Sequence, residues 1–164
     1  MDPINAVRIG LWITDLPNTK GLDMRLRKAL YTDAQLLLDI HNEARLFFTK
    51  QRKLNYTEHF AWLEGNLDAQ DIQIACVNDV SIGYIRHDNH SLSYAIKQRW
   101  RGYGYGKQMI RKYLQMHLGE VFRAEIKPDN TASVNAVISL GFRYCGLVND
   151  LLLFTSPIDN LKSS

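Results

Sequence analysis

Apolar and polar residues recur with two different periods along the chain, and these periods predict where helices and strands lie. Alternation with a period of two is typical of a half-buried strand, and recurrence every three or four residues is typical of an amphipathic helix. Helical spacing covers residues 32–48, 57–67, 106–119 and 129–141. Strands are expected at residues 24–30, 72–77, 81–86, 92–96, 121–127, 142–148 and 150–156. The pattern therefore predicts an α/β (α+β) fold, with about four helices and a mixed central sheet of six to seven strands.

Local signals mark the ends of two of these helices. Thr32 and Gln35 match a capping box at the start of the first helix. Asp129 or Asn130 can cap the last helix, and Gly141 can end it. The apolar side chains expected to face the core at helical spacing are Leu37, Ile40, Ala44, Phe48, Phe60, Leu63, Leu67, Ile110, Tyr113, Leu114 and Leu118.

The connections between the strands predict how the sheet is arranged. Asn78 and Asp79 form one turn and residues 87–90 form another, so three short strands are joined in an antiparallel first half. The strand at 92–96 is followed instead by a glycine-rich turn, the helix at 106–119 and a further strand. That order predicts a right-handed parallel βαβ unit.

The length and composition suit one globular domain with its own core, since 46% of the 164 residues are hydrophobic and 23% are charged. We assign the domain to residues 24–156, with an N-terminal extension of unknown role at 1–23 and a C-terminal tail at 157–164. The early residues lack the pattern of a signal peptide, and no apolar run is long enough to span a membrane. A cytoplasmic protein without a membrane partner is therefore expected.

The cysteines and the charged residues limit the kinds of ligand that fit the chain. Cys76 and Cys145 lie far apart in apolar runs without the spacing of metal ligands, so buried free thiols and no metal site are expected. A formal net charge of +3 is small for a nucleic-acid-binding protein, so nucleic acid is not an expected partner. Arg111 and Lys112 also fit a solvated helix face. The basic residues that gather around one helix start, where they suit any phosphate-bearing ligand, are Lys97, Arg99, Arg101, Lys107, Arg111 and Lys112.

Three glycines stand at every second position in "RWRGYGYGKQMI", directly before a helical pattern. Because the start of a helix exposes main-chain N–H groups, glycines there let an anion approach the backbone closely. A tight turn without a ligand is the alternative. The P-loop motif is excluded because Gln108 follows Gly106 and Lys107, and the dinucleotide motif GxGxxG is excluded because Lys107 stands where its last glycine belongs.

The same stretch carries a resemblance to a known family. Residues 101–106 fit R/Q-x-x-G-x-G/A, and "EIKPDNTASVNAVISLGF" supplies a following strand, an Asn and a Leu-Gly-Phe ending. In these features residues 24–156 resemble the GNAT acetyltransferase superfamily, which implies the GNAT fold and acetyl-CoA as cosubstrate. The resemblance implies that the pyrophosphate, the pantetheine arm and the far side of the coenzyme are bound by Ile96, Arg101, Gly102, Tyr103, Gly104, Tyr105, Gly106, Lys107, Asn130 and Ser133.

Transfer of an acetyl group from a thioester to an amine needs a base for the amine and an acid for the departing thiolate. Direct attack by the amine needs no covalent enzyme intermediate, so neither cysteine is expected to be a nucleophile. Glu125 matches a glutamate that some GNAT enzymes carry five residues before the Asn, which implies a base, although a carboxylate paired with Arg or Lys is the alternative. Many relatives place the acid, a tyrosine, where this chain has Val137. The candidate acids in its place are Tyr94, Tyr105 and Tyr144, and of these we choose Tyr94.

The acceptor is expected at the first two helices and the segment that joins them. Side chains there resemble the subgroup that acetylates amino sugars on nucleotide carriers, since Arg and His suit phosphate or hydroxyl groups and Trp stacks on rings. The alternative for His59 and Trp62 is packing beneath the loop. The candidate substrate-binding residues are Asn42, Arg45, His59, Trp62 and Arg86.

We therefore predict an acetyl-CoA-dependent N-acetyltransferase that acts on a primary amine, such as a nucleotide-linked amino sugar. Acetylation of a protein N-terminus or lysine is a second possibility. A CoA-binding regulatory module without catalysis is a third, which Val137 favours. A homodimer is a further expectation.

Overall fold

The computed structural model describes residues 23–48 and 50–158, so residues 1–22 of the expected extension and 159–164 of the expected tail lie outside it. Seven strands form one sheet in the order β1-β2-β3-β4-β5-β7-β6. The strands are β1 (Met24–Lys28), β2 (Gln73–Val77), β3 (Val80–Asp88), β4 (Ser91–Ile96), β5 (Arg123–Ile126), β6 (Arg143–Val148) and β7 (Leu151–Thr155). The helices are α2 (Ala34–Ala44), α3 (Tyr56–Asn66), α4 (Tyr105–Met116) and α5 (Thr131–Ser139), with short 3-10 turns η1 (Tyr31–Asp33), η2 (Arg45–Phe47) and η3 (Gln98–Trp100).

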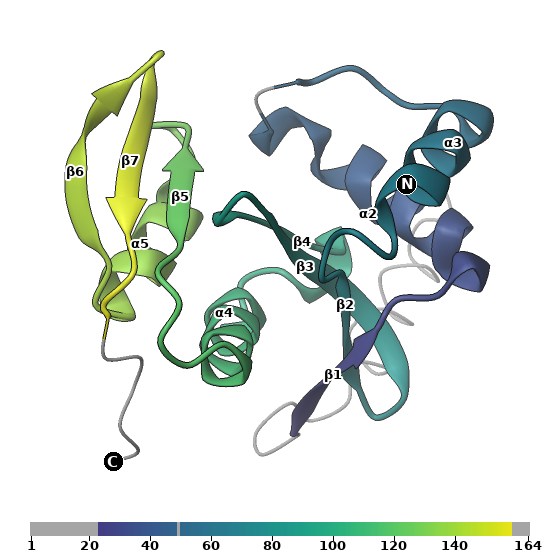
Figure 1. Ribbon diagram of the computed structural model, residues 1–164, viewed down its shortest axis with the longest axis horizontal. Helices are drawn as coiled ribbons and strands as arrows, with labels where there is room; N and C mark the ends of the chain where they lie inside the picture. The colour runs from purple at the N-terminus through teal and green to yellow at the C-terminus, as the bar shows by residue number, and fades with distance from the viewer. Residues whose placement is uncertain (1–22, 49, 159–164) are drawn as a thin grey trace, which may run out of the picture.

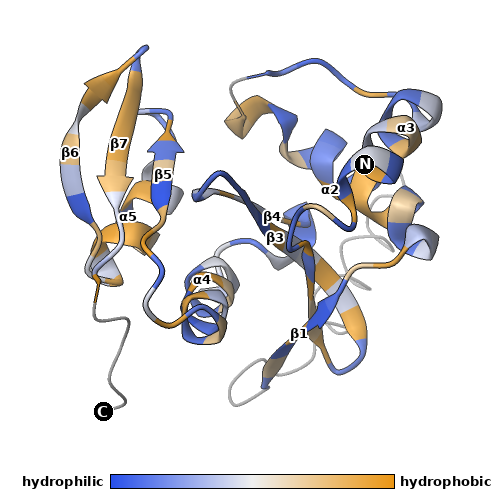
Figure 2. Ribbon diagram, viewed as in Figure 1, coloured by the Kyte–Doolittle hydropathy of each residue, from blue (hydrophilic) through white to orange (hydrophobic). Residues whose placement is uncertain are grey.

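The helices cover the two faces of the sheet and give the molecule two cores. On one face α2 and α3 pack against β2, β3 and β4, and on the other α4 and α5 pack against the sheet (Figure 1). Ile40, Leu63 and Ile74 are fully buried in the first core. Tyr113 and Phe122 are fully buried in the second. The ribbons of α5 and β7 are accordingly mainly hydrophobic (Figure 2).

The antiparallel first half of the sheet is confirmed. β1 pairs with β2, β2 with β3 and β3 with β4, each in antiparallel register. The two hairpin turns carry positive φ angles at Asn78 and Asp79 and at Asn89 and His90. Such angles at both central residues give the turn twist that matches the right-handed twist of the flanking strands.

The parallel β4–α4–β5 unit is also confirmed, but its two strands hardly touch. Their register contains a single pair, Ser91 with Arg123, and the Arg123 N–H donates to the His90 carbonyl oxygen at 2.7 Å. Beyond that point no ladder joins β4 to β5. The sheet is therefore split between β1–β4 and the group β5, β7 and β6, as the two sets of arrows in Figure 1 show.

The start of α2 differs from the expected capping box. The helix begins at Ala34, and the carboxylate of Asp33 accepts the Leu30 N–H at 2.9 Å. Arg27 from β1 also pairs with Asp33 at 2.7 Å, and this pairing lowers the pKa of the Asp33 carboxyl group. Gln35 bonds to Asp39 one turn later instead of reaching back toward Thr32. The Thr32 cap was wrong because the partly buried ion pair of Arg27 with Asp33 holds this end of the helix instead.

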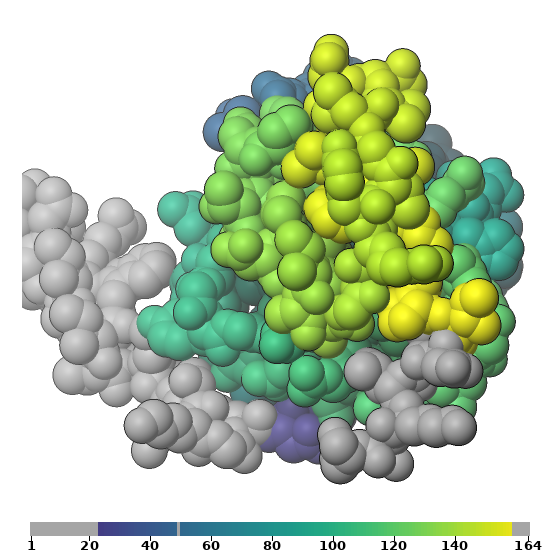
Figure 3. Space-filling view, turned by 90° about the vertical axis from the view of Figure 1, so that its left-hand side faces the viewer, coloured from purple at the N-terminus to yellow at the C-terminus, as the bar shows by residue number. Residues whose placement is uncertain are grey.

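Two burial expectations are also wrong. α4 ends at Met116, three residues before the glycine at 119, so Leu118 lies outside the helix and is 69% exposed. Cys76 is buried as expected, but Cys145 is exposed. Cys145 belongs to β6, the last strand of the sheet, which has a register shift between Tyr144 and Gly146 and is covered on neither face. Viewed from that side, α5, β6 and β7 form the near surface of the molecule (Figure 3).

The end of β4 depends on a glycine in the neighbouring strand, which gives a test of the packing. A Cβ atom on Gly83 would lie 2.4 Å from the Ala95 carbonyl oxygen and 2.8 Å from Ile96 Cδ1. Gly83→Ala should therefore lower the free energy of unfolding by about 1–3 kcal/mol, measured by urea denaturation. Gly65→Ala in α3 is the control, because nothing lies within 4 Å of that position. It should raise stability by about 0.4–1 kcal/mol, and equal effects of the two changes would refute the packing argument.

Candidate active site

The glycine loop, residues 101–106, presents its backbone to solvent and to a cavity. Gly102 and Gly104 have φ angles of +84° and +82°, which only glycine adopts without strain. Gly104 is the N-cap of α4, and no side chain caps that end of the helix. Among the described residues, the main-chain N–H groups of Gly102, Tyr103, Gly104, Gly106 and Lys107 donate to no carbonyl oxygen. The loop therefore offers several N–H groups at the positive end of a helix.

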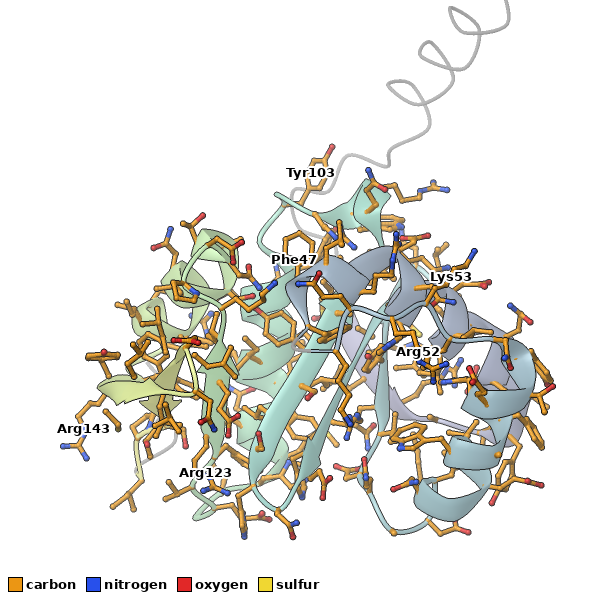
Figure 4. The ribbon with its side chains drawn as sticks, turned by 90° about the horizontal axis from the view of Figure 1, so that it is seen from above. Phe47, Arg52, Lys53, Tyr103, Arg123 and Arg143 are labelled. Atoms are coloured by element: carbon orange, nitrogen blue, oxygen red, sulfur yellow. The ribbon has the colours of Figure 1, made fainter. Side chains whose placement is uncertain are left out.

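Four of these residues, Gly102, Gly104, Gly106 and Lys107, border a cavity with a volume of about 480 Å³. We call it the first cavity. Its size is within the range of small-molecule sites. Phe47 lies beside the glycine loop, and Tyr103 points away from the molecule (Figure 4). Most of the wall comes from the η2 region, the end of β4, the glycine loop and the first turns of α5, with Ala44, Phe47, Phe48, Tyr94, Ile96, Trp100, Arg101, Gly102, Gly104, Tyr105, Gly106, Lys107, Asn130, Ala132, Ser133, Asn135, Ala136 and Ser139.

Arg101 brings a buried positive charge to this cavity. Its Nε donates to the Ile96 carbonyl oxygen at 2.8 Å, and its guanidinium lies 5.2 Å from the centre of the Phe47 ring. Its Nη2 is buried without a hydrogen-bond partner among the described residues. Burial lowers the pKa of this guanidinium, and Glu43 only partly offsets the effect. A buried cationic donor of this kind is stabilised by an anionic or carbonyl-bearing ligand.

The edge of β4 that borders the split supplies further main-chain groups. Lys97 N–H donates to the Ile82 carbonyl oxygen, so odd-numbered residues of β4 point their peptide groups at β3. The main-chain groups of Tyr94 and Ile96 consequently point to the opposite edge, where β5 has moved away. The Ile96 carbonyl oxygen accepts Arg101 Nε, and the other main-chain groups at this edge can bond to an extended ligand that carries amides.

A second, smaller cavity of about 150 Å³ lies in the split itself. Glu125 lines it from β5, is exposed, and makes no ion pair or hydrogen bond within residues 23–48 and 50–158. The alternative of a carboxylate paired with Arg or Lys is therefore absent there. We call this space the second cavity; it is lined by Phe47, Phe48, Ser91, Leu92, Ser93, Tyr94, Ile110, Ala124, Glu125, Ile126, Lys127, Asn130, Ser133 and Val137.

Tyr94 lies between the two cavities and lines both. Its hydroxyl donates to Ser133 Oγ at 2.8 Å, which joins β4 to the first turn of α5 across the split. Burial raises the pKa of Tyr94, so the hydroxyl stays protonated at neutral pH. Val137, one turn further along α5, is buried and lines the second cavity with a side chain that cannot donate a proton. Of the other candidate acids, Tyr105 lines only the first cavity, and Tyr144 is 58% exposed on β6.

Asn130 and Ser133 form the N-terminal cap of α5. The Asn130 side chain accepts the Ser133 N–H at 3.3 Å, and both residues line both cavities. They therefore hold the start of α5 at the site.

The five residues expected to bind the acceptor separate into two groups. The Asn42 side-chain amide donates to the Leu54 carbonyl oxygen and accepts the Leu54 N–H. Arg45 donates to the main-chain carbonyl oxygen of Asn42. These two residues hold the segment that follows η2 in place. Neither borders a cavity.

His59, Trp62 and Arg86 form a cluster on the α2–α3 face of the sheet. The rings of His59 and Trp62 stack at 5.8 Å, and the Arg86 guanidinium lies 5.1 Å from the Trp62 ring centre. His59 is buried, and its Nε2 has no partner among the described residues. Burial lowers the pKa of His59, and burial together with His59 and Arg86 lowers the pKa of His41 beside it. The cluster borders neither cavity, but Arg86 is the Cα partner of Ser93, which lines the second one.

Comparison with known proteins identifies the family of this chain. Residues 23–143 match the family described as the Acetyltransferase (GNAT) domain. The chain belongs to the GNAT acetyltransferase family. No curated protein sequence matches the chain significantly.

Solved structures share the GNAT fold. YncA from Salmonella typhimurium, a putative acetyltransferase solved with acetyl-CoA, has a TM-score of 0.69 and 21% identity, covering 87% of this chain and 98% of that one. The ribosomal-protein-alanine N-acetyltransferase from Brucella melitensis has a TM-score of 0.67 and 24% identity, covering 80% and 96%. A putative phosphinothricin N-acetyltransferase has a TM-score of 0.71 and 18% identity, covering 84% and 99%.

The GNAT chain is thus an N-acetyltransferase that uses acetyl-CoA as cosubstrate. The free N–H groups of the glycine loop and the buried Arg101 suit the coenzyme's anionic part, and the open edge of β4 suits its amide-bearing arm. Within the described residues, no group of His, Cys, Asp and Glu could hold a metal ion. In the same part of the chain, no helix combines the length and the apolar character that a membrane crossing requires.

Among the residues that line the cavities, sequence analysis did not name Phe47 and Lys127, and it expected Phe48 in the core and not at the site. Two adjacent aromatic residues at the end of a helix were a usable signal, because such a pair cannot place both rings in one core. Lys127 gave no signal, since a single lysine after a strand is usually a solvated side chain.

The role of the glycine loop can be tested with two glycines of equal strain. Gly104 and Gly119 have φ angles of +82° and +88°, and a Cβ at either meets nothing within 4 Å. Gly104→Val and Gly119→Val should lower the melting temperature by similar amounts. Acetyl-CoA at about 100 times its Kd should stabilise the wild type and Gly119→Val by about 2.7 kcal/mol. Gly104→Val should lose that stabilisation in a thermal-shift assay, and retention of it would show that the loop does not bind the coenzyme.

Proposed function

We propose that this enzyme transfers the acetyl group directly to a primary amine of a small molecule, such as an amino sugar linked to a nucleotide. The observation that carries the proposal is the second cavity, which lies in the split beside the first and shares Tyr94, Asn130 and Ser133 with it. An amine bound there meets a free carboxylate from Glu125.

Each residue of the proposed reaction has one task. Acetyl-CoA supplies the thioester carbonyl that the amine nitrogen attacks. Glu125 takes a proton from the amine, directly or through water, so that the nitrogen can attack with its free electron pair. As the new C–N bond forms and the C–S bond breaks, the Tyr94 hydroxyl gives its proton to the departing sulfur, and the surplus proton of the acetylated nitrogen returns to the Tyr94 oxygen. Ser133, which accepts the Tyr94 hydrogen bond, positions that hydroxyl between the two cavities.

The enclosure of the second cavity supports a small acceptor over an extended polypeptide. Its volume is about 150 Å³, and Phe47 and Phe48 form one wall while β5 forms another. Lys127 Nζ bonds to the Leu46 carbonyl oxygen at 3.1 Å, which links these two walls. The space between these walls therefore suits a small amine-bearing group.

The cluster of His59, Trp62 and Arg86 supports an acceptor longer than the amine-bearing ring. Ser93 connects it to the second cavity, because Ser93 lines that cavity and pairs with Arg86 on the neighbouring strand. Trp62 can stack on a ring, and Arg86 beside it can pair with a phosphate. A sugar linked to a nucleotide has both features.

The proposal is tested by measuring release of free CoA thiol from acetyl-CoA in the presence of different amines. The panel contains nucleotide-linked amino sugars, simple amino sugars, polyamines and peptides with free N-termini. Turnover is expected to be fastest with the nucleotide-linked amino sugars. Faster turnover with the peptides would assign the enzyme to protein acetylation and reject the small-molecule proposal.

The assigned base and acid predict two different losses of rate. Glu125→Gln should lower kcat about 10²–10⁴-fold, because the amine then lacks its base. Tyr94→Phe should lower kcat less, because a thiolate leaves without full protonation more easily than most groups. Binding of acetyl-CoA, measured by thermal shift, should stay unchanged in Glu125→Gln. Glu64→Gln, an exposed carboxylate on α3, is the control and should keep full activity; an equal loss there would refute the assignment.

A further inference from the structure

Lys127 links the end of β5 to the 3-10 turn η2. It follows directly after β5, and its Nζ bonds to the carbonyl oxygen of Leu46 in η2 at 3.1 Å. The neighbours of Leu46, Phe47 and Phe48, line the second cavity, as Lys127 itself does. The ammonium group therefore lies at the rim of that cavity, between its two walls.

The lysine at this rim has no carboxylate partner. Glu125 stands two positions earlier and lines the same cavity, yet no ion pair joins it to Lys127 or to any other residue in the described ranges. The bond to Leu46 is the one hydrogen bond that the ammonium makes within those ranges. Because an ammonium group has three N–H donors, two of them remain available to a ligand while the first holds Leu46.

The second cavity thus carries one separated negative and one separated positive charge. Its other polar side chains are neutral: Ser91, Ser93, Tyr94, Asn130 and Ser133. A proton-accepting carboxylate and an unpaired ammonium in one cavity complement a molecule with an amine and an anionic group. An acceptor with only an amine would leave the positive charge of Lys127 without a counterpart.

We propose that Lys127 is a specificity-determining residue that binds an anionic group, a phosphate or a carboxylate, of the amine acceptor. This inference rests on the proposed transfer of the acetyl group at the second cavity. It adds that the acceptor's anionic group lies near Lys127 while its amine faces Glu125.

The test compares matched acceptors that differ only in the anionic group. Glucosamine 6-phosphate is paired with glucosamine, and β-alanine is paired with β-alaninamide, so that the phosphate and carboxylate arms are separate. Each pair is assayed by CoA release with the wild type, Lys127→Met and Lys127→Arg. Lys28→Met, which removes an exposed lysine of β1 far along the sheet, is the control.

Lys127→Met should raise KM for the preferred anionic acceptor about tenfold or more, with a much smaller change in kcat. KM for the neutral partner and for acetyl-CoA should stay unchanged, and Lys127→Arg should restore most of the preference. The control should behave as the wild type. If Lys127→Met changes KM equally for both members of each pair, the lysine is only a structural link and the inference is wrong.

Calorimetry separates failure of the inference from failure of the proposed function. The same acceptors are titrated into the wild type and Lys127→Met in the presence of CoA, which requires no turnover. Tighter binding of an anionic acceptor to the wild type supports the role of Lys127 even if no amine releases CoA, in which case the proposed function alone fails. Turnover of amines without any dependence on Lys127 rejects the inference and leaves the proposed function standing.

Discussion

The separation of β4 from β5 after a single residue pair is the constraint on which the rest of the site depends. A continuous parallel ladder would satisfy the peptide groups of Tyr94 and Ile96 and leave no space between the strands. Because the ladder stops at Ser91 and Arg123, those groups face an opening, and both cavities border it. The fold keeps a buried core despite this opening, since α4 and α5 pack against both parts of the sheet on one face.

Two hydrogen bonds connect the walls of the opening between β4 and β5, and both involve residues that the proposed reaction uses. Tyr94 reaches Ser133 from β4, and Lys127 reaches Leu46 from the end of β5. Each bond joins elements that no strand ladder connects, so each one also fixes the distance between the walls. Val137 shows why such a crossing is needed here. Its side chain is buried, lines the second cavity and cannot donate a proton, so the proposed reaction takes its hydroxyl from Tyr94 on the opposite wall.

Sequence alone predicted the parts of this structure that short-range patterns determine. The seven strands, the four helices and the parallel unit followed from periodicity and from the order of elements. The glycine loop was predicted because glycine adopts backbone conformations that other residue types rarely adopt. Thr32 failed as a cap because Asp33 is held by Arg27 from a neighbouring strand, and Asn42 holds Leu54, twelve residues away. Such contacts depend on the tertiary arrangement, and no local pattern encodes them.

In the proposed function the two substrates meet different kinds of group, and such a difference would let acceptor choice vary on one fold. The main chain of the glycine loop and the edge of β4 suit acetyl-CoA, and peptide groups persist when side chains change. The acceptor side consists of side chains: Glu125, Lys127 and the aromatic wall of Phe47 and Phe48. Substitutions there can change the acceptor while the donor site is preserved. Under this proposal the ammonium of Lys127 contributes to acceptor choice, and the opening between β4 and β5 contributes to binding of acetyl-CoA.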